Sequence, residues 1–129
     1  MSTNELRVLI AEDEPTNLEL LHEVLKARNI TPLKAADGEQ ALEMARMHVP
    51  DLILMDLRMP KRHGINVTRE LKDDSTTKDI PIVALTASVM DGTEKQALDA
   101  GCSGYIKKPI NVSTLITEIS KFLRTDEKA

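Results

Sequence analysis

Aromatic side chains are nearly missing from this sequence, whose 129 residues include no Trp, one Phe and one Tyr. Proteins that bind single-stranded nucleic acid stack the bases on aromatic rings, so this mode of recognition is disfavoured. A basic surface is missing as well, because the formal net charge is −4. The sequence therefore carries no electrostatic footprint for nucleic acid, and we expect no nucleic-acid partner.

Long apolar runs and cysteine pairs are also missing. No run approaches the roughly 18 residues of a membrane span, and the first residues, MSTNELR, lack the apolar stretch of a signal peptide. The single Cys102 cannot form an internal disulfide, which agrees with a reducing compartment. We therefore expect a cytoplasmic protein without membrane contacts, in which Cys102 is a small buried or half-buried thiol.

Short apolar runs alternate with helical patterns along the chain. We expect strands at residues 8–11, 32–36, 51–56, 81–85 and 105–106. We expect helices at residues 15–28, from Asp37 onward, and at 64–73, 93–100 and 112–123. Asp37 and Gln40 have the spacing of a capping box, and Gly101 suits a helix C-terminus. The length predicts a single domain over 1–129, with its core at about 6–123 and a polar tail at 124–129.

Five strands that alternate with five helices predict an α/β fold with an all-parallel sheet covered on both faces. The strands are continuous apolar runs, as burial on both faces requires. Five strands suit the flavodoxin-like doubly wound order 2-1-3-4-5. In that order the chain direction reverses between the first and third strands, and ligands bind there, beyond the carboxyl ends of the strands.

Polar side chains follow four of the apolar runs, at the point where each strand ends. They are Glu12 and Asp13, Asp56, Thr86 and Lys108. In the predicted fold these five residues converge at one edge of the sheet. Carboxylates held so close repel each other, and hard oxygen ligands suit Mg²⁺. The pattern therefore predicts a magnesium site, with Asp56 directed at the crevice.

The same residues suit phosphoryl chemistry. An Asp carboxylate can act as a nucleophile toward phosphorus and form an aspartyl phosphate. The Lys108 amine and the Thr86 hydroxyl would hold an anion beside the metal and neutralise charge on the phosphoryl oxygens.

Each of these residues also has a structural explanation when it is taken singly. Glu12 and Asp13 would stabilise a helix N-terminus, Asp56 would be an exposed acid at a strand end, Thr86 would serve a turn, and Lys108 would be a solvated surface charge. Tyr105, in the fifth strand, would likewise pack in the core. Five such coincidences at strand ends are improbable, so we favour the joint site. The three histidines show no metal-ligand spacing and are expected at the surface: His22, His48 and His63.

Four segments resemble the receiver domain of two-component response regulators: LIAEDEPTNLELL, DLILMDLRMPKRHG, IVALTA and GYIKKPI. They occur in the right order and spacing, and the resemblance as a whole extends over roughly residues 6–123. The resemblance implies that Asp56 is the phosphoacceptor and that Asp13 is a direct Mg²⁺ ligand, supported by Glu12. It also implies that the backbone carbonyl of Arg58 is the other protein ligand of the metal.

The resemblance assigns the remaining motif residues too. Thr86 matches the switch hydroxyl, Tyr105 the aromatic switch residue and Lys108 the phosphate-binding lysine, and Lys108–Pro109 matches the cis peptide bond of the family. The implied donor is a sensor histidine kinase or a histidine phosphotransfer protein. The implied output is contact with an effector protein through the fourth helix, fifth strand and fifth helix. Such a domain assists its own phosphotransfer and dephosphorylation without being an enzyme.

Departures from the family pattern leave the lifetime of the phosphoryl group open. Glu12 stands where many relatives have Asp, His63 where an Asp is frequent, and Arg58 and Ser88 occupy positions that tune this lifetime in the family. No helix-turn-helix, catalytic domain or linker follows Leu123, so we expect a stand-alone receiver, and a receiver excised from a hybrid kinase stays open as the alternative.

Two other functions remain in competition with the receiver. One is a Mg²⁺-dependent phosphohydrolase with an Asp nucleophile. Such enzymes usually need a second acid just beyond the nucleophile, where this chain has Leu57 and Arg58, and a cap domain, for which it is too short. The other is a receiver-like module that binds partners without phosphorylation, against which the complete acid, hydroxyl and lysine set argues.

Overall fold

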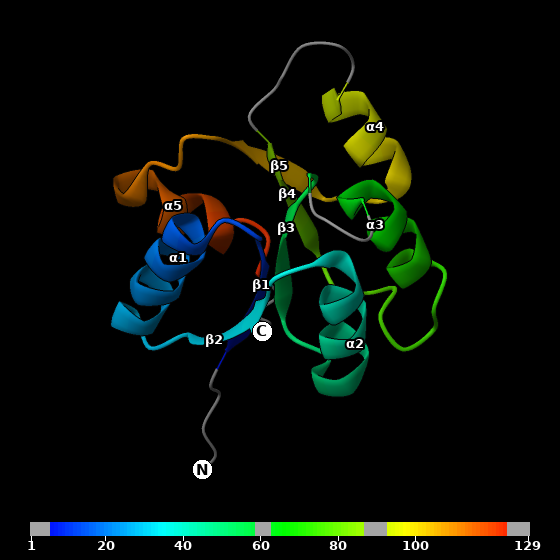
Figure 1. Ribbon diagram of the computed structural model, residues 1–129, viewed down its shortest axis with the longest axis horizontal. Helices are drawn as coiled ribbons and strands as arrows, with labels where there is room; N and C mark the ends of the chain where they lie inside the picture. Colours follow the sequence, from blue (N-terminus) through cyan, green and yellow to red (C-terminus); the bar gives the residue numbers. More distant parts are fainter. Residues whose placement is uncertain (1–5, 59–62, 87–92, 124–129) are drawn as a thin grey trace.

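Five parallel strands form the centre of the molecule, and helices cover both faces of the sheet (Figure 1). The computed structural model describes residues 6–58, 63–86 and 93–123. Ser88 and the polar tail expected at 124–129 lie outside these residues. The strand order β2-β1-β3-β4-β5 confirms the predicted flavodoxin-like topology. None of the helices in the described ranges is long and apolar enough to span a membrane.

All the expected elements are present, with small shifts at their ends. The strands are β1 (Arg7–Ala11), β2 (Thr31–Ala35), β3 (Leu52–Asp56), β4 (Ile82–Thr86) and β5 (Gly104–Lys107). The helices are α1 (Pro15–Ala27), α2 (Gly38–His48), α3 (Gly64–Lys72), α4 (Thr93–Ala100) and α5 (Val112–Ser120).

The largest difference is at the end of α5, which stops at Ser120 and not at residue 123. The amides of Lys121 and Phe122 bond to the carbonyls three residues earlier, so the chain tightens out of the α-helix. Phe122 and Leu123 still pack against the core, which is why their apolar spacing resembles a continued helix.

Alternate strand residues feed two separate hydrophobic clusters, one on each face of the sheet. In β1, Val8 and Ile10 pack with helices α1 and α5, whereas Leu9 and Ala11 pack on the side of α2, α3 and α4. Successive side chains of a strand point to opposite faces, so the same alternation runs through β3 and β4. Burial on both faces explains why these strands are continuous apolar runs.

The start of α2 contains the expected cap. The Asp37 carboxylate accepts a hydrogen bond of 2.8 Å from the Gln40 amide, and Asp37 has the extended backbone of an N-cap residue. The Gln40 side chain returns a bond to the amide of Ala36, one residue before the cap. The sequence signal for this helix start is therefore confirmed.

We expect Asp37→Ala to lower the free energy of unfolding by about 0.5–2 kcal/mol, because it removes the acceptor at the N-cap. Urea unfolding followed by far-ultraviolet circular dichroism measures this loss. Asp37→Asn is the control, since it keeps an acceptor oxygen and should retain most of the stability. Equal losses in the two variants would contradict the capping role.

Candidate functional site

A cleft of about 250 Å³ lies at the carboxyl ends of the strands and contains the residues expected there. Its lining consists of Glu12, Asp13, Glu14, Asn17, Asp56, Leu57, Arg58, Leu85, Thr86 and Lys108. The predicted convergence of Glu12, Asp13, Asp56, Thr86 and Lys108 is therefore observed. Glu14 and Asn17 were not expected in the cleft. Their sequence signal was position: Glu14 directly follows the acidic pair as the N-cap of α1, and Asn17 lies in the first turn of that helix.

Strand alternation decides which of these side chains can meet. Ile10, Leu54 and Ile106 all point toward α1 and α5. Counting on by two residues in each chain segment gives Glu12, Asp56 and Lys108 on that same face. The three charged side chains thus meet because each lies at a strand-end position whose side chain points to the face covered by α1 and α5.

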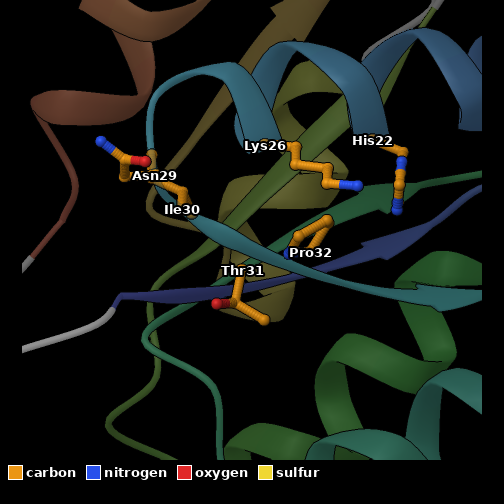
Figure 2. Close-up of a pocket in the computed structure, with 6 residues that line it drawn as sticks. All are labelled: His22, Lys26, Asn29, Ile30, Thr31 and Pro32. Atoms are coloured by element: carbon orange, nitrogen blue, oxygen red, sulfur yellow. The ribbon is translucent and has the colours of Figure 1, made fainter.

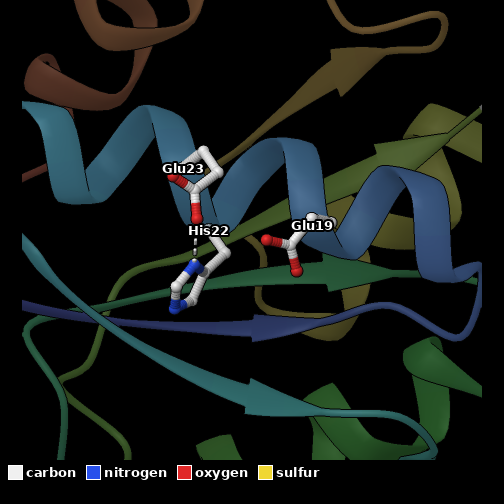
Figure 3. A group of neighbouring side chains, drawn as sticks. All are labelled: Glu19, His22 and Glu23. Carbon is white, nitrogen blue, oxygen red and sulfur yellow. Dashed lines mark hydrogen bonds and ion pairs between the residues drawn. The ribbon is translucent and has the colours of Figure 1, made fainter.

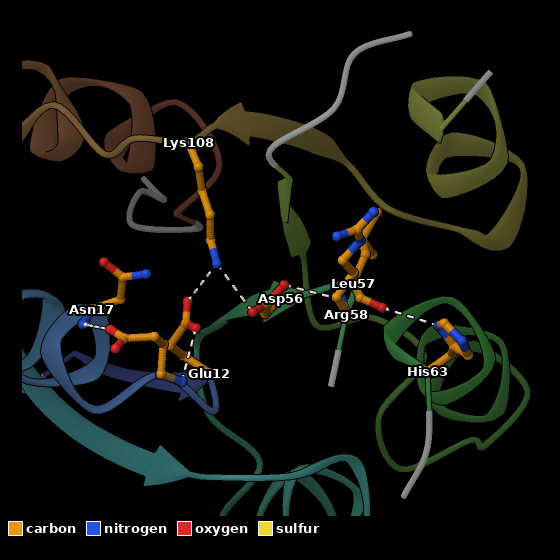
Figure 4. A network of polar contacts seen from close by, with 8 residues as sticks. Glu12, Asn17, Asp56, Leu57, Arg58, His63 and Lys108 are labelled. Carbon is orange, nitrogen blue, oxygen red and sulfur yellow. Dashed lines mark hydrogen bonds and ion pairs between the residues drawn. The ribbon is translucent and has the colours of Figure 1, made fainter. Parts of the chain in front are cut away.

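Lys108 joins the two buried carboxylates (Figure 4). Its Nζ lies 3.0 Å from Glu12 Oε1 and 3.1 Å from Asp56 Oδ2. The Lys108 side chain is 18% exposed, and the Glu12 side chain is fully buried. Burial alone would lower the pKa of Lys108, but hydrogen bonding and charge attraction from Glu12 and Asp56 outweigh it and raise that pKa. The lysine is therefore held as a cation.

Glu12 is the residue of this group whose charged form is disfavoured by its surroundings. Burial raises its pKa above the ordinary value of 4.5, the Asp56 charge raises it further, and the Lys108 contact opposes both. Its Oε2 accepts a bond from the Glu14 amide at 3.1 Å. Its Oε1 is buried, and among the described residues its polar contact is the Lys108 amine, 3.0 Å away. A carboxylate oxygen has two lone pairs, so one remains for a further ligand.

Backbone groups hold the other side of Asp56. The Arg58 amide donates to Asp56 Oδ1 at 3.0 Å, so one carboxylate oxygen faces the backbone and the other faces Lys108. The Leu57 carbonyl accepts from the Gly64 amide at 3.1 Å and lies 3.3 Å from His63 Nδ1. These contacts tie the end of β3 to the start of α3 (Figure 4).

Three carboxylates in the cleft fit a magnesium ion. One oxygen each from Glu12, Asp13 and Asp56 lie within 4.8 Å of one another. Asp13 is exposed, whereas the other two are buried. Mg²⁺ takes oxygen ligands at about 2.0–2.1 Å and keeps several waters, so an open, oxygen-rich cleft with an under-bonded carboxylate oxygen suits it.

The remaining predicted residues lie around this centre. Thr86 is buried at the end of β4, and its carbonyl accepts from the Lys108 amide at 2.7 Å. Lys108–Pro109 is a cis peptide bond, as expected. Tyr105 is 38% exposed and lies beside Ala84 in the β4–β5 register, on the face opposite to Ile106. Cys102 is buried, as expected.

Comparison with known proteins gives one consistent family. The family described as the response regulator receiver domain matches residues 8–120. The polar-differentiation response regulator DivK of Brucella anthropi is 40% identical over 116 residues, which are 90% of this chain and 94% of that protein.

Solved structures agree with this match. The receiver domain of a sensor histidine kinase from Pseudomonas aeruginosa, with a magnesium ion coordinated in its active site cleft, aligns at a TM-score of 0.85 and 31% identity over 92% of this chain and 97% of that one. The chemotaxis response regulator CheY4 of Vibrio cholerae aligns at a TM-score of 0.88 and 26% identity over 93% and 100% of the two chains.

We expect Gly64→Ala to destabilise the protein by about 1–3 kcal/mol, a usual cost of overpacking. A Cβ at Gly64 would lie 2.5 Å from the Asp56 carbonyl oxygen and 2.8 Å from the Leu57 Cα. Both are backbone atoms that cannot swing aside. Urea unfolding measures the loss. The control is Gly104→Ala, whose Cβ would meet only the far end of the Phe122 ring. Equal losses in the two variants would contradict this explanation.

The raised pKa of Glu12 predicts a pH dependence of stability in the presence of a chelator. The folded state keeps the Glu12 proton to higher pH than the unfolded chain does. Stability from this group therefore falls as the pH rises from about 4.5 through the raised folded pKa. Glu12→Gln cannot titrate and should lose this part of the decline. Urea unfolding at a series of pH values tests this, and parallel curves for the two proteins would refute it.

Proposed function

This chain belongs to the response regulator receiver domain family, and from that premise we propose that Asp56 accepts a phosphoryl group in a Mg²⁺-dependent reaction. The contact that carries the proposal is the Lys108 amine, shared between Asp56 and Glu12 at 3.1 and 3.0 Å. A fixed cation beside a carboxylate at a strand end is what an incoming phosphoryl group requires. We further propose that the chain acts as a single receiver domain in the cytoplasm.

The proposed magnesium ligands are Asp13, Asp56 and the Arg58 carbonyl, with Glu12 in support. The close carboxylate oxygens support this assignment, and so does the magnesium ion in the cleft of the Pseudomonas aeruginosa receiver. A bound Mg²⁺ supplies positive charge that offsets the charge on the transferring phosphoryl oxygens.

Asp56 is the proposed nucleophile. Its Oδ1 is fixed by the Arg58 amide, which leaves Oδ2 to attack phosphorus. The proposed donor is a phosphohistidine of a sensor histidine kinase or a histidine phosphotransfer protein. As the new O–P bond forms, the N–P bond breaks and its electron pair returns to the imidazole of the donor. In this scheme Lys108 moves from the Asp56 carboxylate to a phosphoryl oxygen, so it is charged before and after transfer.

The signal is then proposed to leave the cleft through Thr86 and Tyr105. By strand alternation, the side chains of both residues face the side of the sheet that α4 covers. Tyr105 lies beside the small side chain of Ala84. A phosphoryl oxygen is a strong acceptor that would draw the Thr86 hydroxyl inward. The Tyr105 ring would follow into the space beside β4 and remodel the surface of α4, β5 and α5. This surface carries exposed apolar residues, namely Leu98, Tyr105 and Val112, and is the proposed effector face.

The central prediction is that acetyl phosphate with Mg²⁺ phosphorylates the protein once, at Asp56. Phosphate-affinity electrophoresis should show one retarded band that disappears in Asp56→Asn or in excess chelator. Asp99→Asn is the control, because Asp99 is an exposed aspartate on α4. A band that persists in Asp56→Asn would refute the assignment. Continuous release of phosphate over many turnovers would favour a hydrolase, and no modification would favour a binding module.

A paired lysine comparison tests the electrostatic part of this scheme. Lys108→Ala should slow phosphorylation strongly, whereas Lys107→Ala should not. Lys107 is exposed, and by strand alternation its side chain points to the opposite face of the sheet from Lys108. Circular dichroism checks that both variants are folded. Equal rates in the two variants would remove Lys108 from the reaction.

A further inference from the structure

A second group of potential metal ligands lies on α1, outside the set of residues that line the cleft. Glu19, His22 and Glu23 are spaced i, i+3 and i+4, so they share one face of the helix (Figure 3). One ligand atom from each residue lies within 4.8 Å of the other two. The sequence pattern Glu-Leu-Leu-His-Glu carries this spacing, so the expectation that no histidine has metal-ligand spacing missed it.

The histidine of this group is not a freely solvated side chain. The His22 side chain is only 21% exposed, and its Nδ1 lies 3.1 Å from Glu23 Oε2. Figure 3 shows the ring hanging from α1 toward the strands, with Glu23 above it and Glu19 to one side. The ring orientation is therefore largely set before any ion binds, and this lowers the entropy cost of coordination.

Space is available beside the ring. His22 and Lys26 line an open hollow of about 410 Å³ between α1 and the edge strand β2 (Figure 2). The other lining residues are Asn29, Ile30, Thr31 and Pro32. An ion at His22 would therefore remain accessible to water, which could complete its coordination.

The ligand chemistry of this group favours a cation. Two glutamate oxygens and one imidazole nitrogen lie together on one face of the helix. Two ionised carboxylates would bring about two negative charges to a divalent ion. Lys26 is the one nearby opposing charge that lines the hollow, and it is exposed on a flexible side chain.

We propose that Glu19, His22 and Glu23 form a second cation site, which takes a divalent transition metal such as Zn²⁺. Zinc binds His nitrogen and Glu oxygen at about 2.0–2.2 Å, and three protein ligands with a water are a common set. Binding would draw in the two exposed glutamate side chains from their present positions, in which the three ligand atoms lie within 4.8 Å of one another. The imidazole distinguishes this site from the oxygen-only cleft at Asp56, which suits Mg²⁺. This site does not depend on the proposed phosphorylation.

The test is a Zn²⁺ titration of the whole protein in saturating Mg²⁺, followed through the ring nitrogens of its three histidines by NMR. The His22 nitrogens should shift with saturation at one equivalent, while those of His48 and His63 stay in place. Assignments come from through-bond correlations in the isotope-labelled wild-type protein, with His22→Gln and His48→Gln as a check. Zinc-induced shifts at His48 or His63, with none at His22, would overturn the proposal, and this reading does not depend on the variants.

Isothermal titration of Zn²⁺ under the same conditions measures the contribution of each ligand. His22→Gln, Glu19→Gln and Glu23→Gln should each weaken binding about tenfold or more, whereas the control His48→Gln should not. Lys26→Gln should tighten binding, because it removes a neighbouring positive charge. Wild-type affinity in His22→Gln would overturn the site.

Discussion

The contact of the Lys108 amine with Glu12 and Asp56 is the constraint on which the cleft depends. Two carboxylates buried this close to each other are unfavourable unless a cation lies between them. Lys108 reaches that position because its own amide bonds to the Thr86 carbonyl and Ile106 anchors β5 in the core. The amine thus links the ends of three strands that are distant in sequence, and it offsets the cost of burying Glu12 next to Asp56.

The arrangement of these residues follows from two regularities that are visible in the sequence. Apolar runs mark the strands, and the first polar residue after each run marks the edge where parallel strands end. These regularities placed Glu12, Asp56, Thr86 and Lys108 together before any contact was known. Strand alternation then explains why Glu12, Asp56 and Lys108 lie on one face of the sheet while Thr86 lies on the other. This distinction can be made only when the buried residues show which face each strand position points to.

Other features depend on packing between segments that no local pattern encodes. The spacing of Phe122 and Leu123 suits a helix, yet the chain tightens after Ser120 and the two side chains reach the core from outside α5. The small size of residue 64 is required by the Asp56 carbonyl, a neighbour in space. His22 was expected at the surface, and its side chain keeps 21% of its area exposed while it lines a hollow beside the turn into β2.

The sheet also divides the interior into two hydrophobic clusters, which have no side chain in common among the residues that the structure describes. Residues facing α1 and α5 form one cluster, and residues facing α2, α3 and α4 form the other. Glu12, Asp56 and Lys108 extend the first cluster, whereas Thr86 and Tyr105 extend the second. Substitutions that repack one cluster therefore act on the packing of the other only through the backbone of the sheet. A lineage built on this plan can alter the side that carries Glu12, Asp56 and Lys108 and the side that Tyr105 faces at separate times, with the backbone of the sheet as their common boundary.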